Sequence, residues 1–309
     1  MIGKALTKGL LDKGYSVIIL TRKLPDTMYK IWDKENFNPN PASRISYVSW
    51  NIQKKTIDAD AVSKADYLIH LAGVNLGEKR WTTKRKQEII SSRVNSGKLI
   101  VESLTKIPNQ VKAVISSSAI GYYGPDLPLA FSQGKSFEEN DPSSNDFLGQ
   151  TCRQWEESIE PITQLGKRIV KLRTGIVLSK EGGALPRFIM PLRFGLATIL
   201  GSGKQIISWI HIEDLVRLYI SAIENETISG VYNAVAPRPV SNKEFVLTLA
   251  KTRNKFFIPV RVPSFVLKII LGEMSIEVLK SATVNCKKIY ETGFVFQYPE
   301  IKSAIKQLK

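Results

Sequence analysis

Short apolar runs alternate with amphipathic stretches along the first 236 residues. Residues 2–13 place apolar side chains at helical spacing, and Gly14 follows them as a helix C-terminal glycine does. Continuous apolar runs of strand length and further helical patterns come next. The predicted order is helix 2–13, strand 16–20, loop 24–44, strands 45–50 and 65–72, helix 82–105, strand 111–116, helix 146–160, strand 168–172, helix 214–225 and strand 230–236.

This order predicts the fold class. Strands that alternate with helices at this spacing favour an α/β fold, in which a parallel sheet carries helices on both faces. After residue 236 the pattern changes to helices punctuated by prolines. We therefore expect one domain over residues 1–236 and a smaller, mainly helical region over residues 237–309.

Small and polar residues follow four of the predicted strands. In parallel sheets, ligands bind at the carboxyl ends of the strands, so these positions predict a ligand crevice. Tight turns between strands and helices are the alternative explanation, but four such ends together favour the crevice. The segments are Thr21-Arg22, Leu71-Ala72-Gly73, Ser116-Ser117-Ser118 and Arg173-Thr174-Gly175.

Composition narrows the class of protein. The 309 residues are 43% hydrophobic and 23% charged, an ordinary globular balance. Two cysteines are too few for a disulfide framework, and two histidines leave no zinc ligand set. No apolar run reaches the roughly 18 residues of a membrane span. We therefore expect a cytoplasmic protein with no signal peptide, no metal and no membrane partner.

The charge is strongly positive. The net charge is +16, with +9 in residues 1–110, zero in residues 111–240 and +7 in residues 241–309. Such a field attracts nucleic acid, acidic membranes or phosphorylated small molecules, although solvated surface lysines explain it equally. The densest basic run, at 84–86, belongs to no nucleic-acid-binding motif. We therefore expect no nucleic acid partner.

A set of motifs in a fixed order resembles a known family. The chain is similar to the atypical extended short-chain dehydrogenases called epimerase family proteins, within the NAD(P)-dependent epimerase/dehydratase superfamily. The resemblance covers essentially the whole chain, and the C-terminal part resembles the extra domain of unknown function of that family. The motifs are LAGVN at 71–75, SSAIGYYG at 117–124, LRTGIVL at 172–178, GGA at 182–184, GSG at 201–203, SWIHIEDL at 208–215, LGEM at 271–274 and GFVFQYP at 293–299.

The resemblance implies a Rossmann-like doubly wound sheet and a nicotinamide dinucleotide, with NADP favoured over NAD. Arg22 lies where an adenosine 2′-phosphate would lie, and an arginine suits that group, whereas an NAD site favours an acid. A surface charge is the alternative for Arg22, and a solvated helix pair is the alternative for Glu88 and Arg93. The implied cofactor residues are Gly3, Thr21, Arg22, Leu71, Ala72, Gly73, Glu88, Arg93 and Val177.

The start of the chain departs from the family pattern. Members open with a strand and a turn of the form G-G-T-G-x-I-G, whereas this chain opens with Met1-Ile2-Gly3, the end of that turn. The glycines of such a turn let backbone N–H groups approach a pyrophosphate. We expect a chain that begins at an internal methionine of a longer protein, with a truncated pseudoenzyme as the alternative. Residues 1–309 are then expected to bind NADP weakly or not at all.

The catalytic positions depart as well. Phe147 and Thr151 stand where the family pattern of short-chain dehydrogenases has the catalytic tyrosine and lysine, and a phenyl ring exchanges no proton. Ser118 remains at the serine position, and Tyr122 is a candidate phenol, with packing over the crevice as the alternative. His211 is a candidate acid or base, with ordering of a loop as the alternative.

Two functions remain open. The first is an NADP-dependent oxidoreductase or epimerase that acts on a small polar substrate, with Ser118 and Tyr122 polarising an oxygen atom and residues 182–191 and the C-terminal region covering the substrate. The second is a dinucleotide-binding protein or pseudoenzyme without turnover, which Phe147 and Thr151 favour. A homodimer is left open.

Overall fold

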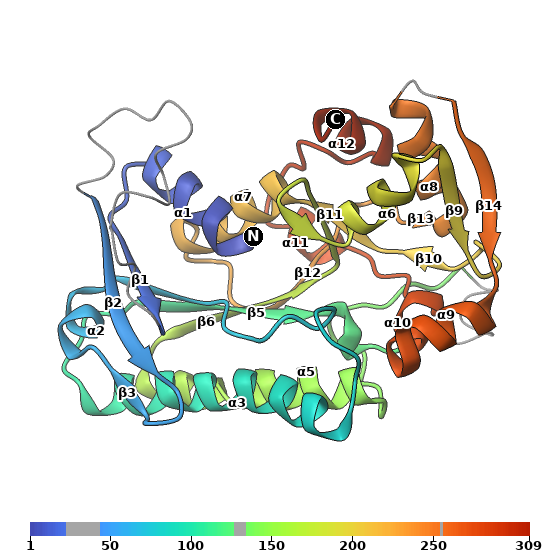
Figure 1. Ribbon diagram of the computed structural model, residues 1–309. Coiled ribbons are helices and arrows are strands. Elements are labelled where there is room, and N and C mark those ends of the chain that lie inside the picture. The colour runs from blue at the N-terminus through green and yellow to red at the C-terminus, as the bar shows by residue number, and fades with distance from the viewer. Residues whose placement is uncertain (23–43, 127–133, 254–255) are drawn as a thin grey trace.

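The computed structural model describes residues 1–22, 44–126, 134–253 and 256–309. Its centre is a four-stranded sheet in the order β12-β6-β5-β4, and every neighbouring pair is parallel (Figure 1). Ala113–Ile115 of β5 and Ile169, Val170 and Leu172 of β6 are buried, which suits a sheet that is covered on both faces. The strands are β4 (Tyr67–His70), β5 (Ala113–Ala119), β6 (Arg168–Thr174) and β12 (Gly230–Ala234).

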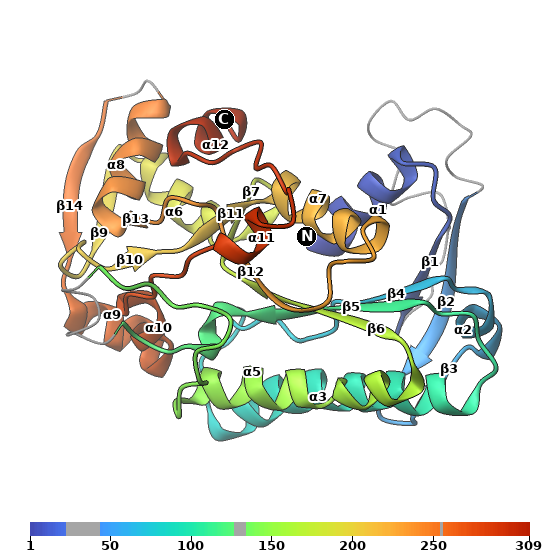
Figure 2. The same cartoon turned by 180° about the vertical axis from the view of Figure 1, so that it is seen from behind.

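Helices cover both faces of this sheet. The long helix α3 (Thr83–Lys106) and α5 (Phe147–Glu157) lie side by side on one face, while α1 (Ile2–Asp12) and α7 (Ile212–Glu224) lie on the other (Figures 1 and 2). The apolar stripe of α1 packs into the same core as α7 and β6. The predicted α/β class with a Rossmann-like parallel sheet is thus confirmed.

A second, smaller sheet stands beside the first. Strand β1 (Val17–Thr21) pairs in parallel with β2 (Ile45–Asn51), and β2 pairs antiparallel with β3 (Thr56–Ile57). Helix α2 (Ala59–Lys64) leads from β3 to β4. In the described part of the chain, β1 forms a ladder with β2 alone and β4 with β5 alone, so β1 and β4 belong to two separate sheets.

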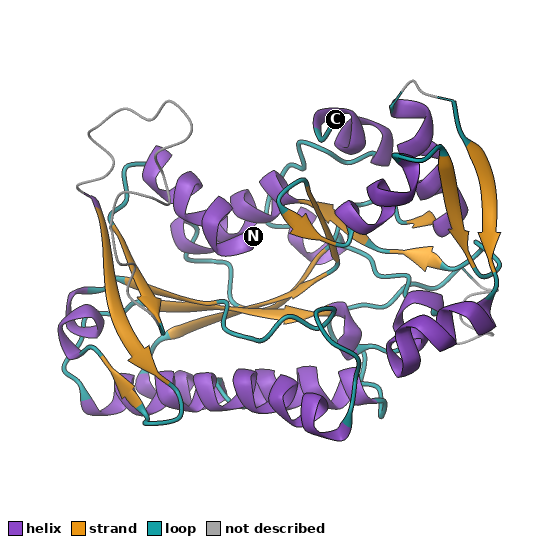
Figure 3. Ribbon diagram, viewed as in Figure 1, coloured by secondary structure: helices purple, strands orange, loops and turns teal. Residues whose placement is uncertain are grey.

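Most of the remaining elements build a lobe beside the central sheet (Figure 3), whereas η3 (Glu160–Leu165), which follows α5, packs against α3 and β6. Strand β14 pairs with β9 and β13 pairs with β10, so that strands after residue 236 are paired with strands before it. The elements before residue 236 are η2 (Ile120–Tyr122), η3 (Glu160–Leu165), β7 (Ile176–Ser179), β8 (Gly182–Gly183), α6 (Leu185–Leu192), β9 (Leu196–Leu200), β10 (Ile206–Ile207) and β11 (Trp209–His211). Those after it are β13 (Val240–Ser241), α8 (Asn242–Thr252), β14 (Ile258–Val262), α9 (Ser264–Leu271), η4 (Gly272–Met274), α10 (Ser275–Leu279), α11 (Lys287–Tyr290) and α12 (Ile301–Gln307).

The predicted helices and strands are all present among the described residues, but several end elsewhere. Strand β5 continues to Ala119 and β6 to Thr174, while β4 ends at His70. The predicted loop at 24–44 lies outside the described residues except for Arg44. None of the described helices is both long and apolar enough to cross a membrane.

Candidate functional site

The N-terminus of α1 lies against the loop that leaves β4. A Cβ atom built on Gly3 would lie 3.7 Å from Cδ1 of Leu71, so the structure brings these two predicted residues together. Leu71 and Ala72 are half-buried and Gly73 is exposed, which leaves the backbone of this loop open. The first-turn N–H groups of a helix carry a partial positive charge, so this end of α1 is suited to a phosphate group.

Arg93 of α3 forms hydrogen bonds with the same loop. Its guanidinium donates to the carbonyl oxygens of Ile89 at 3.0 Å and Val74 at 3.2 Å. It also lies 5.1 Å from the centroid of the Trp155 ring. A Cβ on Gly73 would come within 2.9 Å of its Cζ, so only glycine fits there without displacement. Burial lowers the pKa of Arg93. The solvated helix pair is therefore wrong for Arg93, which holds the loop through backbone carbonyls.

Glu88 acts on the next part of this loop through Arg85. Its carboxylate lies 3.0 Å from Arg85, whose buried guanidinium also donates to the carbonyl of Asn75 at 2.6 Å. The sequence prediction did not include Arg85, which lies in the basic run at 84–86. The spacing of the helix could have indicated that Arg85 is buried, because positions 85, 89 and 93 are four residues apart and share one buried helix face.

The other predicted cofactor residues lie in β7 and at the end of β1. Val177 is buried in β7, and its carbonyl oxygen would lie 3.3 Å from a Cβ on Gly183. The Met1 side chain lies about as close to the same hairpin, at 3.4 Å from that Cβ position, so the hairpin reaches the start of α1. Thr21 and Arg22 end β1 in the smaller sheet, and Arg22 is exposed.

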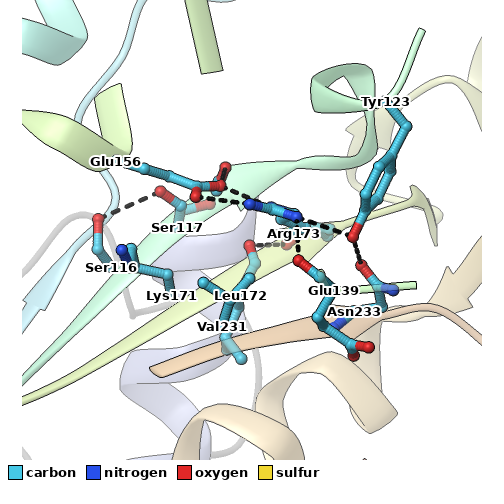
Figure 4. A network of polar contacts seen from close by, with 12 residues as sticks. Ser116, Ser117, Tyr123, Glu139, Glu156, Lys171, Leu172, Arg173, Val231 and Asn233 are labelled. Atoms are coloured by element: carbon cyan, nitrogen blue, oxygen red, sulfur yellow. Dashed lines mark hydrogen bonds and ion pairs between the residues drawn. The ribbon is translucent and has the colours of Figure 1, made fainter. Parts of the chain in front are cut away.

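Ser118 belongs to a buried network of polar side chains. Its hydroxyl donates to Oε1 of Glu156 at 2.6 Å. Glu156 also accepts from Nε and Nη2 of Arg173, at 2.8 and 2.9 Å, in a bidentate pair that Figure 4 shows. Arg173 is 3% exposed and Glu156 is 7% exposed, so neither charge is screened by water. The Ser118 hydroxyl is thus held by a carboxylate inside the protein.

Arg173 connects this network to two tyrosines. Its Nη1 donates to the Tyr123 hydroxyl at 3.0 Å, and that hydroxyl donates to Oδ1 of Asn233 at 2.7 Å (Figure 4). Burial pushes the pKa of Arg173 down, but the hydrogen bond and charge of Glu156 outweigh it and raise that pKa. Burial raises the pKa of Tyr123, against the effect of Arg173. Arg173 therefore stays charged and Tyr123 stays neutral at ordinary pH.

Tyr122 covers the network from the outside. Its half-buried ring lies with its centroid 3.4 Å from Cζ of Arg173, and it meets the Tyr123 ring edge-on at 5.4 Å. The structure thus brings the two predicted catalytic residues, Ser118 and Tyr122, to one cluster organised by Arg173. Packing and catalysis are both compatible with this place, so the catalytic roles of the two residues stay predictions.

Phe147 and Thr151, the pair predicted to replace the tyrosine and lysine, have partners of their own. The Thr151 hydroxyl donates to the carbonyl of Phe147, one helical turn back, at 2.6 Å. The Phe147 ring packs edge-on against Trp81, with centroids 5.0 Å apart, and Lys86 Nζ lies 5.1 Å from its centroid. Phe147 and Trp81 therefore form an aromatic pair at this position.

Residues from α6, α9 and η4 hold the outer part of the loop after β4. Arg187 of α6 donates to the carbonyl of Gly77. Arg80 donates to the carbonyl of Ile270 in α9 at 2.9 Å, and Lys86 is paired with Glu273 in η4. The segment 182–191 and the C-terminal region, which we expected to cover the substrate, thus both contact this loop.

The two histidines have structural partners. His70 is buried between the hydroxyls of Ser116 and Ser96, and burial lowers its pKa to about 4. His211 caps α7 by accepting from the N–H of Glu213 at 3.2 Å, and burial lowers its pKa as well. These contacts favour the ordering role for His211. Within the described ranges, no group of three or more His, Cys, Asp or Glu is arranged to hold a metal ion.

Known proteins are similar to this chain in sequence and in fold. The chain is 35% identical over 308 residues to epimerase family protein YfhF of Bacillus subtilis, which covers 99% of this chain and 94% of YfhF. The structure of human epimerase family protein SDR39U1 with NADPH matches with a TM-score of 0.83 and 28% identity, over 100% of this chain and 95% of that chain. The nucleoside-diphosphate sugar epimerase of Corynebacterium glutamicum matches with a TM-score of 0.74 and 30% identity, over 100% of this chain and 56% of that chain.

Two family models match separate parts of the chain. Residues 262–308 match a domain of unknown function, in agreement with the predicted resemblance of the C-terminal part. Residues 1–234 match the model described as the NAD dependent epimerase/dehydratase family. That match covers more than half of the chain and contains both the loop after β4 and the Arg173 network. The chain belongs to the NAD dependent epimerase/dehydratase family.

Proposed function

We propose that the crevice between the N-terminus of α1, the loop after β4 and the β7–β8 hairpin holds a nicotinamide dinucleotide. The observation that carries this proposal is the proximity of Gly3 to the Leu71 side chain, which puts the first turn of α1 beside the loop after β4. Gly73, where a Cβ would lie 2.9 Å from Cζ of Arg93, leaves that backbone without a side chain. The NADPH in the solved human relative supports the same class of ligand.

We favour NADP over NAD because of Arg22. It is the exposed cation at the end of β1, where the family resemblance implies an adenosine 2′-phosphate. A guanidinium makes charge-assisted, bidentate hydrogen bonds to a phosphate and finds no such partner on a ribose hydroxyl.

The reaction we propose is hydride transfer to or from a small polar substrate, as in an oxidoreductase or epimerase. The nicotinamide supplies the hydride chemistry when it is bound. Tyr122 is the phenol that lies at the half-buried edge of the cluster, where it donates a hydrogen bond to a substrate oxygen. Ser118 and Glu156 fix Arg173, on which the Tyr122 ring rests.

A second candidate is a dinucleotide-binding protein without turnover. It is favoured by Phe147, whose ring carries no exchangeable proton, and by Thr151, whose hydroxyl is bonded to its own helix. This candidate predicts dinucleotide binding, with no oxidation of NADPH by any carbonyl compound or nucleotide sugar.

The Ser118→Ala variant tests the first proposal. We expect turnover with a panel of carbonyl compounds and nucleotide sugars to fall by orders of magnitude, while NADPH binding followed by saturation-transfer NMR stays the same. Ser117→Ala is the matched control, because Ser117 is adjacent in β5 and it is Ser118 that donates to Glu156. Unchanged turnover in Ser118→Ala rejects the role of Ser118. Micromolar NADPH binding by residues 1–309 contradicts the expectation of weak binding.

A further inference from the structure

One face of the β9–β14 sheet is apolar and exposed. The parallel register sets Ile258 beside Leu196, and side chains of such a pair stand on the same side of a sheet. Phe194 and Phe256 come two residues before them in the chain, just outside the two strands, and they are 80% and 84% exposed. Val260, two residues after Ile258, continues the row. We call the set Phe194, Leu196, Phe256, Ile258 and Val260 the Phe194–Phe256 face.

The other side of the same sheet is part of the core. Ala197 and Ile199 alternate with the exposed residues of β9 and pack with Phe245 and Leu249 of α8. The exposed face therefore belongs to a sheet whose other side is packed in the core. Burying such phenylalanines against a partner removes a large apolar area from water, which is the usual sign of an interaction site.

The free edge of β14 does not suit strand addition. The N–H of Ile258 donates to the carbonyl of Gly195, and the carbonyl of Val262 accepts from Gly201. Backbone groups alternate along a strand, so the nitrogen of Pro259 lies on the edge away from β9. A proline has no N–H to donate there, and such a residue protects an edge from pairing. A partner therefore has to use the face of the sheet.

The charge around the face selects an anionic partner. Among the described residues, 182–212, 245–253 and 256–272 contain no aspartate or glutamate, whereas together they contain seven lysines and arginines. Two copies of this surface would repel each other, which disfavours a second copy of the chain. A hollow of about 350 Å³ beside the face is lined by Leu192, Arg193, Ala250, Arg253, Phe256, Phe257 and Lys309.

The hollow combines three cations with an apolar wall. Arg193, Arg253 and Lys309 supply charge for a phosphate, while Phe256 and Phe257 supply contact for hydrocarbon beside it. Figures 1 and 2 show β9, β14, α8 and α12 together in the lobe beside the central sheet. A phospholipid surface offers both chemistries at the same depth.

We propose that the Phe194–Phe256 face docks onto an anionic phospholipid bilayer. The phenylalanines enter the boundary between headgroups and acyl chains, and the hollow takes the phosphate of one lipid headgroup. The protein lies on the membrane surface and does not span it. This proposal replaces the expectation that the chain has no membrane partner.

Vesicle flotation with residues 1–309 tests the proposal. We expect binding to vesicles of phosphatidylglycerol and phosphatidylcholine at about 0.1 M salt, with none to phosphatidylcholine alone. Phe194→Ser and Phe256→Ser should each weaken binding by about tenfold. A matched control replaces Tyr290 and Val295, two exposed apolar side chains outside the face, by serine and should bind as the parent does.

Charge variants give a second, independent readout. Arg193→Gln and Arg253→Gln should each weaken binding by about fivefold, since each cation near an anionic membrane adds to the attraction. The proposal is overturned if anionic vesicles do not bind or if the phenylalanine and charge variants bind them as the parent does. Binding to polyglutamate without binding to vesicles also overturns it, and assigns the face to an acidic protein instead.

Discussion

Ser118 and Glu156 share a 2.6 Å hydrogen bond in which the acceptor is also the bidentate partner of Arg173. One carboxylate therefore satisfies a hydroxyl and a guanidinium that have no access to water. Removing a single partner from such a group leaves the other charge buried and uncompensated, which costs far more than an exposed ion pair contributes.

Glu156→Gln should therefore destabilise the protein by about 3 kcal/mol in urea unfolding followed by circular dichroism. The control is Glu157→Gln on the same helix, where the exposed pair with Arg153 contributes less than about 0.5 kcal/mol. Equal losses in the two variants would show that the Arg173 network is not the origin of the stability.

Arg22→Gln should change cofactor preference without changing the fold. Loss of a charge-assisted contact to the 2′-phosphate is expected to weaken NADPH binding by about tenfold, and NADH binding should stay the same. Saturation-transfer NMR with both dinucleotides measures the ratio. Lys98→Gln, at an exposed site on α3, is the control for loss of one positive charge. If both dinucleotides weaken together, Arg22 does not recognise the 2′-phosphate.

Gly73→Ala should disturb the loop after β4. The new Cβ would lie 2.9 Å from Cζ of Arg93, whose guanidinium is held by the carbonyls of Ile89 and Val74. We expect a loss of about 1–3 kcal/mol in stability, the usual result of overpacking, together with weaker NADPH binding. Thermal unfolding and the NMR titration check both effects. A variant as stable as the parent would mean that Arg93 moves aside freely.

His70 predicts a pH-dependent stability. Burial lowers its folded-state pKa to about 4, below the ordinary 6.5, so the unfolded chain binds more protons between these values. The contribution of neutral His70 is therefore complete above about pH 6.5, and about 3 kcal/mol of it is lost as the pH falls towards 4. His70→Gln keeps a donor and an acceptor for Ser96 and Ser116 and should remove that part of the slope. Unfolding curves of both proteins across this range measure the difference, and equal slopes would contradict the prediction.

The sequence predicted the central fold because its signals are local. The apolar run of β5 and the helical stripe of α1 each show their period within a dozen residues. The end of β5 was predicted three residues too early, because Ser116–Ser118 look like a turn. Their hydroxyls have partners such as His70 and Glu156, which are 46 and 38 residues away, and no local pattern shows them.

The β9–β14 sheet and the buried arginines lay beyond local patterns for different reasons. Strand β14 contains Pro259, which argues against a strand, and its partner β9 lies some sixty residues earlier in the chain. Arg85 and Arg93 are charged, so their burial follows only from the carbonyls and the Trp155 ring that meet them. Both cases depend on tertiary contacts, which no local sequence pattern shows.

The separation of β1 and β2 from the four strands of the central sheet has a consequence for how the molecule unfolds. No residue of β1 or β2 is fully buried, and their mutual ladder does not continue into β4 within the described ranges. Opening this corner therefore breaks no hydrogen bond of the four central strands, so its amides should exchange with solvent at a lower free energy than those of β5 and β6. The corner that presents Arg22 is thus a separate cooperative unit, and a ligand that binds there would gain its affinity partly by ordering it.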